Sequence, residues 1–167
     1  YCMSYATIRR QDIQNGPGIR TSIFVQGCAF HCRECFNSET WPFEGGKEFT
    51  QKEMNLLMEL SDKHFIVGLS VLGGEPLHPY NIDTVIDICR TFKEKFKDKS
   101  IWLWSGYRYE EIVNKDILDY IDVLIDGRFM YDLRDFKLMY RGSRNQRVID
   151  VKKTKEKGEI VLLEVDN

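Results

Sequence analysis

Apolar residues along this chain follow two spacings, which predict strands and helices in alternation. Short runs of β-branched and other apolar residues between turn residues are typical of buried strands, and apolar residues three or four positions apart are typical of helices. The first pattern predicts strands at 21–26, 64–72, 100–105 and 120–125. The second predicts a helix from residue 50 and helices at 81–97 and 109–118, so that one helix separates each pair of strands.

Two of the predicted helices carry further local signals. Thr50 is followed three residues later by Glu53, which is the spacing of a capping box. Apolar residues then recur at Met54, Leu57, Met58 and Leu60. The apolar face of the 81–97 helix consists of Ile82, Val85, Ile86, Cys89 and Phe92. Lys and Glu lie mostly on the opposite face, so this helix is expected to cover the core.

Strands that alternate with helices in this way favour βαβ units and an α/β fold with a parallel sheet. Four or five units are too few to close an eight-stranded barrel of ~250 residues. Ligands of open parallel sheets bind beyond the carboxyl ends of the strands. The segments that follow the four strands are Gly27 and the cysteine-containing loop, Gly73–Pro76, Ser105–Tyr107 and Asp126–Gly127. We therefore expect a single site at this edge.

Length and composition favour one domain over residues 1–167, with a core at about 10–147. The chain is 43% hydrophobic and has a net charge of −2, so there is no broad electrostatic case for nucleic-acid binding. No run approaches the ~18–20 apolar residues of a membrane span. The first residue is Tyr1 rather than Met, so we expect that a few residues are missing or were removed by processing. A charged tail begins at Asp150, and its apolar run at 159–165 could add an edge strand.

Three of the five cysteines share one short segment with the spacing C-x3-C-x2-C: Cys28, Cys32 and Cys35. Cys2 and Cys89 lie far from it, which argues against a disulfide framework and favours a reducing cytoplasm. Structural zinc and most 4Fe-4S clusters take four protein ligands. Three thiolates without an obvious fourth suggest a cubane cluster with one open iron. The alternative is a zinc site that uses His31, although its adjacency to Cys32 disfavours good geometry for both side chains.

The cysteine spacing resembles the signature of the radical S-adenosylmethionine enzymes. The segment just before it, Asn15-Gly16-Pro17-Gly18-Ile19-Arg20, resembles the activases of glycyl radical enzymes. Three further segments resemble the activating proteins of anaerobic (class III) ribonucleotide reductases: 102–107, 126–129 and 141–146. The resemblance covers roughly residues 10–147. It implies a curved, incomplete parallel βα barrel of the radical S-adenosylmethionine type.

The resemblance also implies an oxidoreductase activity and its cofactors. A 4Fe-4S cluster on Cys28, Cys32 and Cys35 would bind S-adenosylmethionine at its open iron and cleave it reductively to a 5′-deoxyadenosyl radical. That radical would generate a glycyl radical on the large subunit of the anaerobic ribonucleotide reductase. A low-potential reductant such as flavodoxin would supply the electron. No side chain is expected to act as an acid or a base, and no nucleic acid or membrane is expected as a partner.

Further residues are implied to contact S-adenosylmethionine. They are Gly73, Gly74, Glu75, Pro76, Phe36, Asn37, Ser105, Gly106, Tyr107 and Asp126. Two glycines let main-chain carbonyls approach a ligand closely, and Pro76 fixes the exit of the chain. Glu75 could instead orient the loop through hydrogen bonds. Glu34 departs from the aromatic or apolar residue that many of these enzymes carry before the last cysteine.

Four other features keep alternative roles. The Asn15–Gly18 turn is implied to cover the cluster or meet the partner, and Arg20 is either near the cluster or in a surface ion pair. Trp102 and Trp104 share a face of their strand, and at least one is expected to pack in the core. Residues 141–147 form either a solvated loop or a segment that closes the site or docks the reductase.

Two other functions compete with this hypothesis. One is activation of another glycyl radical enzyme of the pyruvate formate-lyase type, whose activases share the Gly16–Arg20 segment. The other is a non-catalytic module that binds zinc or carries electrons, for which metal analysis is the simplest test.

Overall fold

The computed structural model describes residues 3–27 and 46–163. Cys28, Cys32, Cys35, Phe36 and Asn37 lie outside these residues, so the predictions made for them stay predictions. The expectation of a single domain likewise stays a prediction. The described residues nevertheless include all four segments that follow the predicted strands, of which the first is represented by Gly27 alone.

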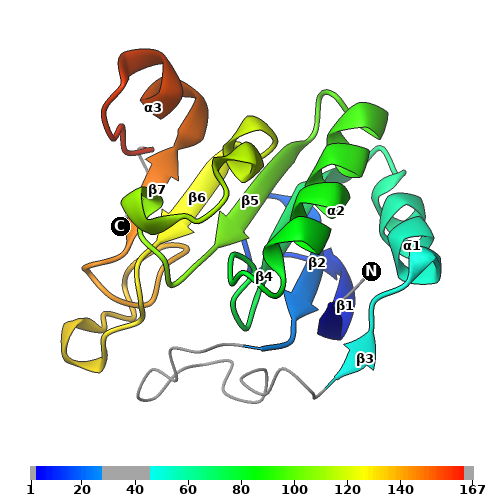
Figure 1. Cartoon of the computed structure of the whole chain (residues 1–167), viewed down its shortest axis with the longest axis horizontal. Helices are drawn as coiled ribbons and strands as arrows, with labels where there is room; N and C mark the ends of the chain where they lie inside the picture. The colour runs from blue at the N-terminus through cyan, green and yellow to red at the C-terminus, as the bar shows by residue number, and fades with distance from the viewer. Residues whose placement is uncertain (1–2, 28–45, 164–167) are drawn as a thin grey trace.

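Seven strands form one sheet in the order β3-β1-β2-β4-β5-β6-β7 (Figure 1). Their bounds are β1 Ser4–Asp12, β2 Ile19–Val25, β3 Lys47–Glu48, β4 Ile66–Gly73, β5 Ser100–Trp104, β6 Val123–Asp126 and β7 Arg147–Asp150. The α-helices are α1 Gln51–Ser61, α2 Ile82–Lys95 and α3 Val151–Lys157. Short 3₁₀ helices occupy η2 Tyr109–Glu111, η3 Lys115–Asp119 and η4 Tyr131–Leu133.

The central strands β2, β4, β5 and β6 are the four that the sequence predicts, and they run parallel. The parallel sheet that the sequence predicts is confined to these four strands, and antiparallel strands that it does not predict flank them on both sides. β1 pairs antiparallel with β2 and β3, and β7 pairs antiparallel with β6. Neither antiparallel neighbour needs a crossover α-helix. Residues 13–18 connect β1 to β2, and the longer segment 127–146 connects β6 to β7. The sheet is open, with β3 and β7 at its edges.

The two faces of the sheet differ in what covers them. α1 and α2 lie over one face and close an apolar core with it (Figure 1). The predicted capping box is present, and the five predicted apolar residues of α2 are all buried. On the other face, Trp102 packs with Val123, Ile125 and Val148. Trp104 lies beside it with ring centroids 6.0 Å apart, which confirms that the two tryptophans share a face.

The helix predicted at 109–118 is wrong, because two separate 3₁₀ helices, η2 and η3, occupy this segment. Ile112 is extended between them, with φ −62° and ψ 124°. The Asn114 side chain then accepts a bond from the Asp116 backbone N–H, a local competitor of the helical hydrogen bond. Asn and the β-branched pair Ile112 and Val113 are also weak helix formers.

The charged tail differs from its prediction as well. Its first part is the helix α3, with Asp150 as N-cap and Gly158 as a left-handed C-cap. The apolar run after it makes one isolated bridge, between Leu162 and Ile149, rather than a strand within the described residues. The Thr154 side chain helps to hold this return, since its Oγ1 accepts from the Val161 N–H at 2.9 Å. Two backbone bonds act with it: the Asp150 N–H bonds the Val161 carbonyl at 2.9 Å, and the Leu163 N–H bonds the Val148 carbonyl at 2.8 Å.

Arg20 is fully buried at the start of β2, so the alternative of a surface ion pair is wrong. Its guanidinium donates to Ser70 Oγ at 2.9 Å and to the carbonyls of Leu69 and Ser100 at 3.0 and 2.9 Å. A weaker bond reaches the Pro17 carbonyl. Burial lowers the pKa of Arg20 to about 10, so the group still carries its charge at neutral pH. Carbonyl dipoles therefore solvate this cation in place of water.

Gly68 provides the space for the Arg20 guanidinium. A Cβ at this position would overlap the Ser100 carbonyl oxygen and Arg20 Nη2. Overpacking of this kind typically costs about 1–3 kcal/mol. We predict that Gly68→Ala lowers the free energy of unfolding by this amount, as measured by urea denaturation.

The matched control is Val67→Ala, at the position directly before Gly68 in β4, where the residue is 45% exposed. It should change the free energy of unfolding by about 0.5 kcal/mol or less. Equal effects of the two substitutions would contradict the packing argument for Gly68.

Candidate functional site

The segments that follow β2, β4, β5 and β6 meet at one edge of the sheet, as the sequence predicts. Gly27 follows β2, and the Gly74 N–H bonds the Val25 carbonyl of that strand at 2.8 Å. The Ser105 N–H bonds the Ile125 carbonyl at 2.9 Å, and the Gly127 N–H bonds the Tyr107 carbonyl at 3.3 Å. Hydrogen bonds thus join the four segments in two neighbouring pairs.

The turn at Gly73 and Gly74 packs directly against Gly27. The Glu75 N–H bonds the Gly27 carbonyl at 2.6 Å. Gly73 has a positive φ of 109°, and a Cβ there would lie 2.7 Å from the Val25 backbone. A Cβ on Gly74 would overlap the Gly27 carbonyl oxygen. Both positions therefore require glycine, because the two backbones approach too closely for a side chain.

Glu75 connects this turn to the segment after β5. Its side chain is buried and accepts three hydrogen bonds, from Ser105 Oγ at 2.7 Å, the Gly106 N–H at 2.6 Å and the Leu77 N–H at 2.9 Å. Burial raises the pKa of the Glu75 carboxyl to about 7, and the three donors oppose this rise. The alternative that Glu75 orients its loop is thus supported by its contacts.

Asn81 belongs to this arrangement although its function was not predicted. It is the N-cap of α2, but its side chain makes no capping bond. Instead its Nδ2 donates to the Glu75 carbonyl at 2.9 Å and to the Gln26 carbonyl at 3.3 Å. Its buried Oδ1 has no hydrogen-bond partner among the described residues. Asn before an apolar periodic segment is a normal helix-start signal, so nothing in this pattern predicts a link between two loops.

Asp126 is buried in an ion-pair cluster at the end of β6. It accepts from Arg147 Nε at 3.0 Å, from Arg147 Nη2 at 2.5 Å and from the Tyr109 N–H at 2.8 Å. Arg147 also bonds Glu110 at 2.9 Å. The carboxylates of Asp126 and Glu110 raise the pKa of Arg147 above its ordinary value. Asp126 therefore fixes the segment after β5 against β7.

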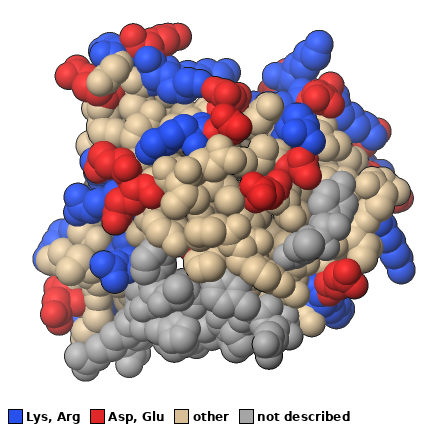
Figure 2. Space-filling model, in the orientation of Figure 1, with Lys and Arg blue, Asp and Glu red and all other residues tan. Residues whose placement is uncertain are grey.

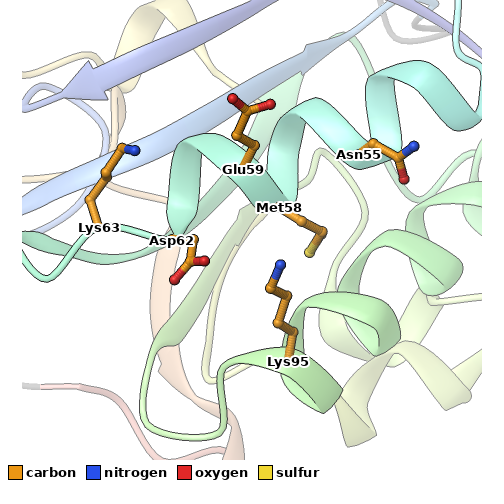
Figure 3. Close-up of a pocket in the computed structure, with 6 residues that line it drawn as sticks. All are labelled: Asn55, Met58, Glu59, Asp62, Lys63 and Lys95. Carbon is orange, nitrogen blue, oxygen red and sulfur yellow. The ribbon is translucent and has the colours of Figure 1, made fainter.

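The pocket drawn in Figure 3 lies elsewhere. It has a volume of about 420 Å³ between α1 and α2, and its lining residues are Asn55, Met58, Glu59, Asp62, Lys63 and Lys95 (Figure 3). None of the predicted site residues lines it. Within residues 3–27 and 46–163, no group of three His, Cys, Asp or Glu side chains could hold a metal ion. In the same part of the chain, no helix is both long enough and apolar enough to cross a membrane.

Comparison with known proteins identifies the family. A family model described as a 4Fe-4S single cluster domain matches residues 14–149. The anaerobic ribonucleoside-triphosphate reductase-activating protein of Enterobacteria phage T4 is 40% identical over 146 residues, which cover 87% of this chain and 93% of the relative. Its namesakes from Vibrio cholerae and Escherichia coli K12 are 40% and 38% identical and cover 86% and 87% of this chain, and 96% and 97% of themselves.

The chain belongs to the family of anaerobic ribonucleoside-triphosphate reductase-activating proteins.

This identification confirms the family predicted from the cysteine spacing and the flanking segments. The 4Fe-4S match supports an iron-sulfur cluster and an activating role for this family member. The matched region runs from the turn before β2 into β7, so it contains both the cysteine segment and the edge described above.

The raised pKa of Glu75 generates a prediction for stability. The ordinary pKa of a glutamate carboxyl is 4.5, and in the folded protein it is about 7. The stability that the neutral carboxyl contributes is therefore fully present below pH 4.5 and is lost as the pH rises through about 7. We predict that the free energy of unfolding of Glu75→Gln, relative to the unsubstituted protein, increases by roughly 3 kcal/mol between pH 4.5 and 8.

Anaerobic urea denaturation of both proteins across this pH range measures the difference. Subtraction of the two curves removes every group that titrates equally in both. A difference that does not change with pH would show that the Glu75 carboxyl titrates at its ordinary value.

Proposed function

We propose that this chain is a radical S-adenosylmethionine oxidoreductase that activates the anaerobic ribonucleoside-triphosphate reductase. In this proposal Cys28, Cys32 and Cys35 hold a 4Fe-4S cluster, and S-adenosylmethionine binds beside it. When bound and given one low-potential electron, the two groups would together supply a carbon-centred radical able to abstract hydrogen from a glycine Cα. The names of the relatives support the reductase as the protein substrate.

The contact between Gly27 and the Gly73–Glu75 turn carries the proposal. Gly27 directly precedes Cys28, and its carbonyl accepts the Glu75 N–H. The first cluster ligand is therefore covalently attached to a residue that the two-glycine turn contacts. A backbone without side chains at this point suits a ligand that must lie close to both the thiolates and main-chain polar groups.

The contacts of the described residues divide the proposed ligand site into two parts. Ser105 and Asp126 are buried and already bonded within the protein, so we assign them the positioning of the segments around the ligand. Main-chain carbonyls of Gly73, Gly74 and Gly106 are the better candidates for direct contact, because the N–H groups of Gly74 and Gly106 are already bonded within the protein. Pro76, Tyr107, Phe36 and Asn37 are proposed to complete the site.

The protein's own role is to bind, orient and exclude water, and no side chain is assigned to acid or base chemistry. We propose that the open seven-stranded sheet is the incomplete barrel of this enzyme class, so that a glycine-bearing loop of the reductase can enter. A low-potential reductant such as flavodoxin would deliver the electron. The free thiol of buried Cys89 suits a reducing compartment such as the cytoplasm.

Electron paramagnetic resonance of the anaerobically reconstituted, reduced protein tests the proposal. We expect a 4Fe-4S signal that changes when S-adenosylmethionine is added, followed by a glycyl radical signal on the reductase. A cluster signal that ignores S-adenosylmethionine would indicate an electron carrier, and bound zinc without a cluster would indicate a structural site.

The three clustered cysteines should each be essential. We predict that Ala at Cys28, Cys32 or Cys35 abolishes cluster assembly or reduces S-adenosylmethionine cleavage at least ~100-fold, because the cluster loses a thiolate. Iron analysis and methionine release measure the two effects. Cys89→Ala is the control, since Cys89 is buried in α2 and burial raises its pKa to about 12. Loss of the cluster in that control would contradict a three-cysteine site.

Gly74→Val tests the two-glycine turn. The added side chain would collide with the Gly27 carbonyl, so the turn must move away from the cysteine segment. We predict at least ~10-fold weaker binding of S-adenosylmethionine with the iron content retained. Gly158→Val, at a position with no atom within 4 Å of a Cβ, controls for valine at a glycine where no collision follows. Its φ is positive and that of Gly74 is not, so any backbone strain falls on the control alone. Unchanged affinity in Gly74→Val would mean that the turn does not contribute to the ligand site.

A further inference from the structure

The segment between β6 and β7 displays large apolar side chains to solvent. We call residues 128–144 the 128–144 loop. Phe136 is 85% exposed, and Met130 and Met139 are 48% and 39% exposed. Single exposed apolar residues are ordinary, but an aromatic side chain held out from a fixed loop resembles the anchors of protein interfaces. The question is therefore whether the 128–144 loop is fixed.

Hydrogen bonds from the 141–146 segment hold the backbone of the 128–144 loop. Gln146 Oε1 accepts from the N–H groups of Gly142 and Ser143, and its Nε2 donates to the Gly127 carbonyl at 3.0 Å. Asn145 Nδ2 donates to the Arg128 carbonyl at 2.8 Å. The Arg144 N–H bonds the Leu133 carbonyl at 2.9 Å, which closes the loop upon itself.

Tyr140 attaches the 128–144 loop to the sheet. Its carbonyl accepts from Trp104 Nε1 at 2.6 Å, and its ring packs edge-on against Trp102 with centroids 5.0 Å apart. Tyr140 has a positive φ of 66°, which is uncommon for a bulky residue and persists only where the surroundings enforce it. Phe136 is thus displayed from a loop that is closed by internal bonds and fastened to β5.

The 128–144 loop starts and ends at the edge of the sheet that carries the candidate site. It follows Asp126 and Gly127, and it returns through Arg147, which bonds Asp126. Figure 1 shows it projecting beyond the end of β6 on the side where the β2 arrow also ends. A polypeptide that inserts a segment at this edge would meet the loop.

Charge gives the chemistry of the surface that the loop would meet. The whole chain has fewer basic than acidic residues, 24 against 26. The 128–144 loop has five basic residues and two acidic ones. Two of the basic residues lie close to Phe136 in sequence: Lys137 follows it directly, and Arg134 precedes it by two positions. Figure 2 shows charged and uncharged surface side by side at the lower left, where the loop lies in Figure 1. The complementary surface is an apolar pocket with acidic side chains around it.

We propose that the 128–144 loop docks the glycine-bearing protein substrate, with Phe136 inserted in an apolar pocket of that protein and the exposed side chains of Arg134 and Lys137 facing an acidic rim. This inference rests on the proposed function, because it takes the anaerobic ribonucleotide reductase as the substrate. It assigns the 141–146 segment the task of fixing the loop that docks the reductase.

The experiment compares three measured quantities for the reconstituted protein and its variants. They are S-adenosylmethionine cleavage by the reduced protein alone, its Kd for the cognate reductase, and the concentration that gives half-maximal glycyl radical. Phe136→Ala should raise the last two quantities about 10-fold or more and leave the first unchanged. Lys137→Glu should slow association, and high salt should reduce its effect.

Matched controls come from the opposite end of the parallel strands, where β4 and β5 begin. Phe65→Ala removes an aromatic side chain that is 37% exposed just before β4, and Lys97→Glu makes the same charge change after α2. Both should bind the reductase as the unsubstituted protein does. Equal effects of Phe136→Ala and Phe65→Ala would overturn the docking inference, as would a Phe136→Ala variant that alters self-association in sedimentation but not reductase binding.

Failure of the proposed function and failure of the docking inference give different results in these measurements. If the unsubstituted protein forms no glycyl radical and cleaves no S-adenosylmethionine, the proposed function fails and the docking inference with it. If the unsubstituted protein does both and Phe136→Ala matches it in all three measured quantities, only the docking inference fails.

Discussion

The backbone contact between Gly27 and the Gly73–Glu75 turn is the constraint on which the candidate site depends. Two adjacent parallel strands end here, and their exits touch without a side chain between them. Two side chains, those of Asn81 and Glu75, reinforce that contact. Asn81 ties the Glu75 carbonyl to Gln26, and the Glu75 carboxyl reaches across to Ser105 and Gly106. The result is a set of main-chain groups with fixed positions beside the start of the cysteine segment.

The buried carboxyl groups at this edge form hydrogen bonds with other groups of the protein. Glu75 and Asp126 are both buried, yet each accepts several donors from neighbouring segments. Buried carboxylates with unmet hydrogen bonds would be costly, so these two residues require the segments to stay together. Such an arrangement suits chemistry that comes from cofactors, for which a protein mainly supplies position and a dry environment.

The sequence predicted what depends on local pattern and failed where contacts distant in sequence decide. The four parallel strands, the capping box at Thr50 and the buried face of α2 follow from apolar spacing and were predicted correctly. The antiparallel β1 and β7 have no comparable local signal, since their pairing depends on neighbours already in the sheet. The 109–118 segment has helical spacing, but its Tyr109 N–H bonds Asp126 and its Asn114 caps a second turn. The roles of Asn81 and Arg147 likewise come from partners that spacing cannot reveal.

The buried guanidinium of Arg20 changes how the segment before β2 should be understood as a family signature. Gly16 has a positive φ of 105°, and a Cβ there would lie 2.9 Å from Arg20 Cδ. The Pro17 carbonyl accepts from the same guanidinium. Packing and hydrogen bonding around the buried Arg20 guanidinium therefore explain the residues at positions 16 and 17 of the signature without reference to a ligand. A search pattern built on this segment alone would therefore detect the architecture, and it would not distinguish a chain that has the three cysteines from one that lacks them.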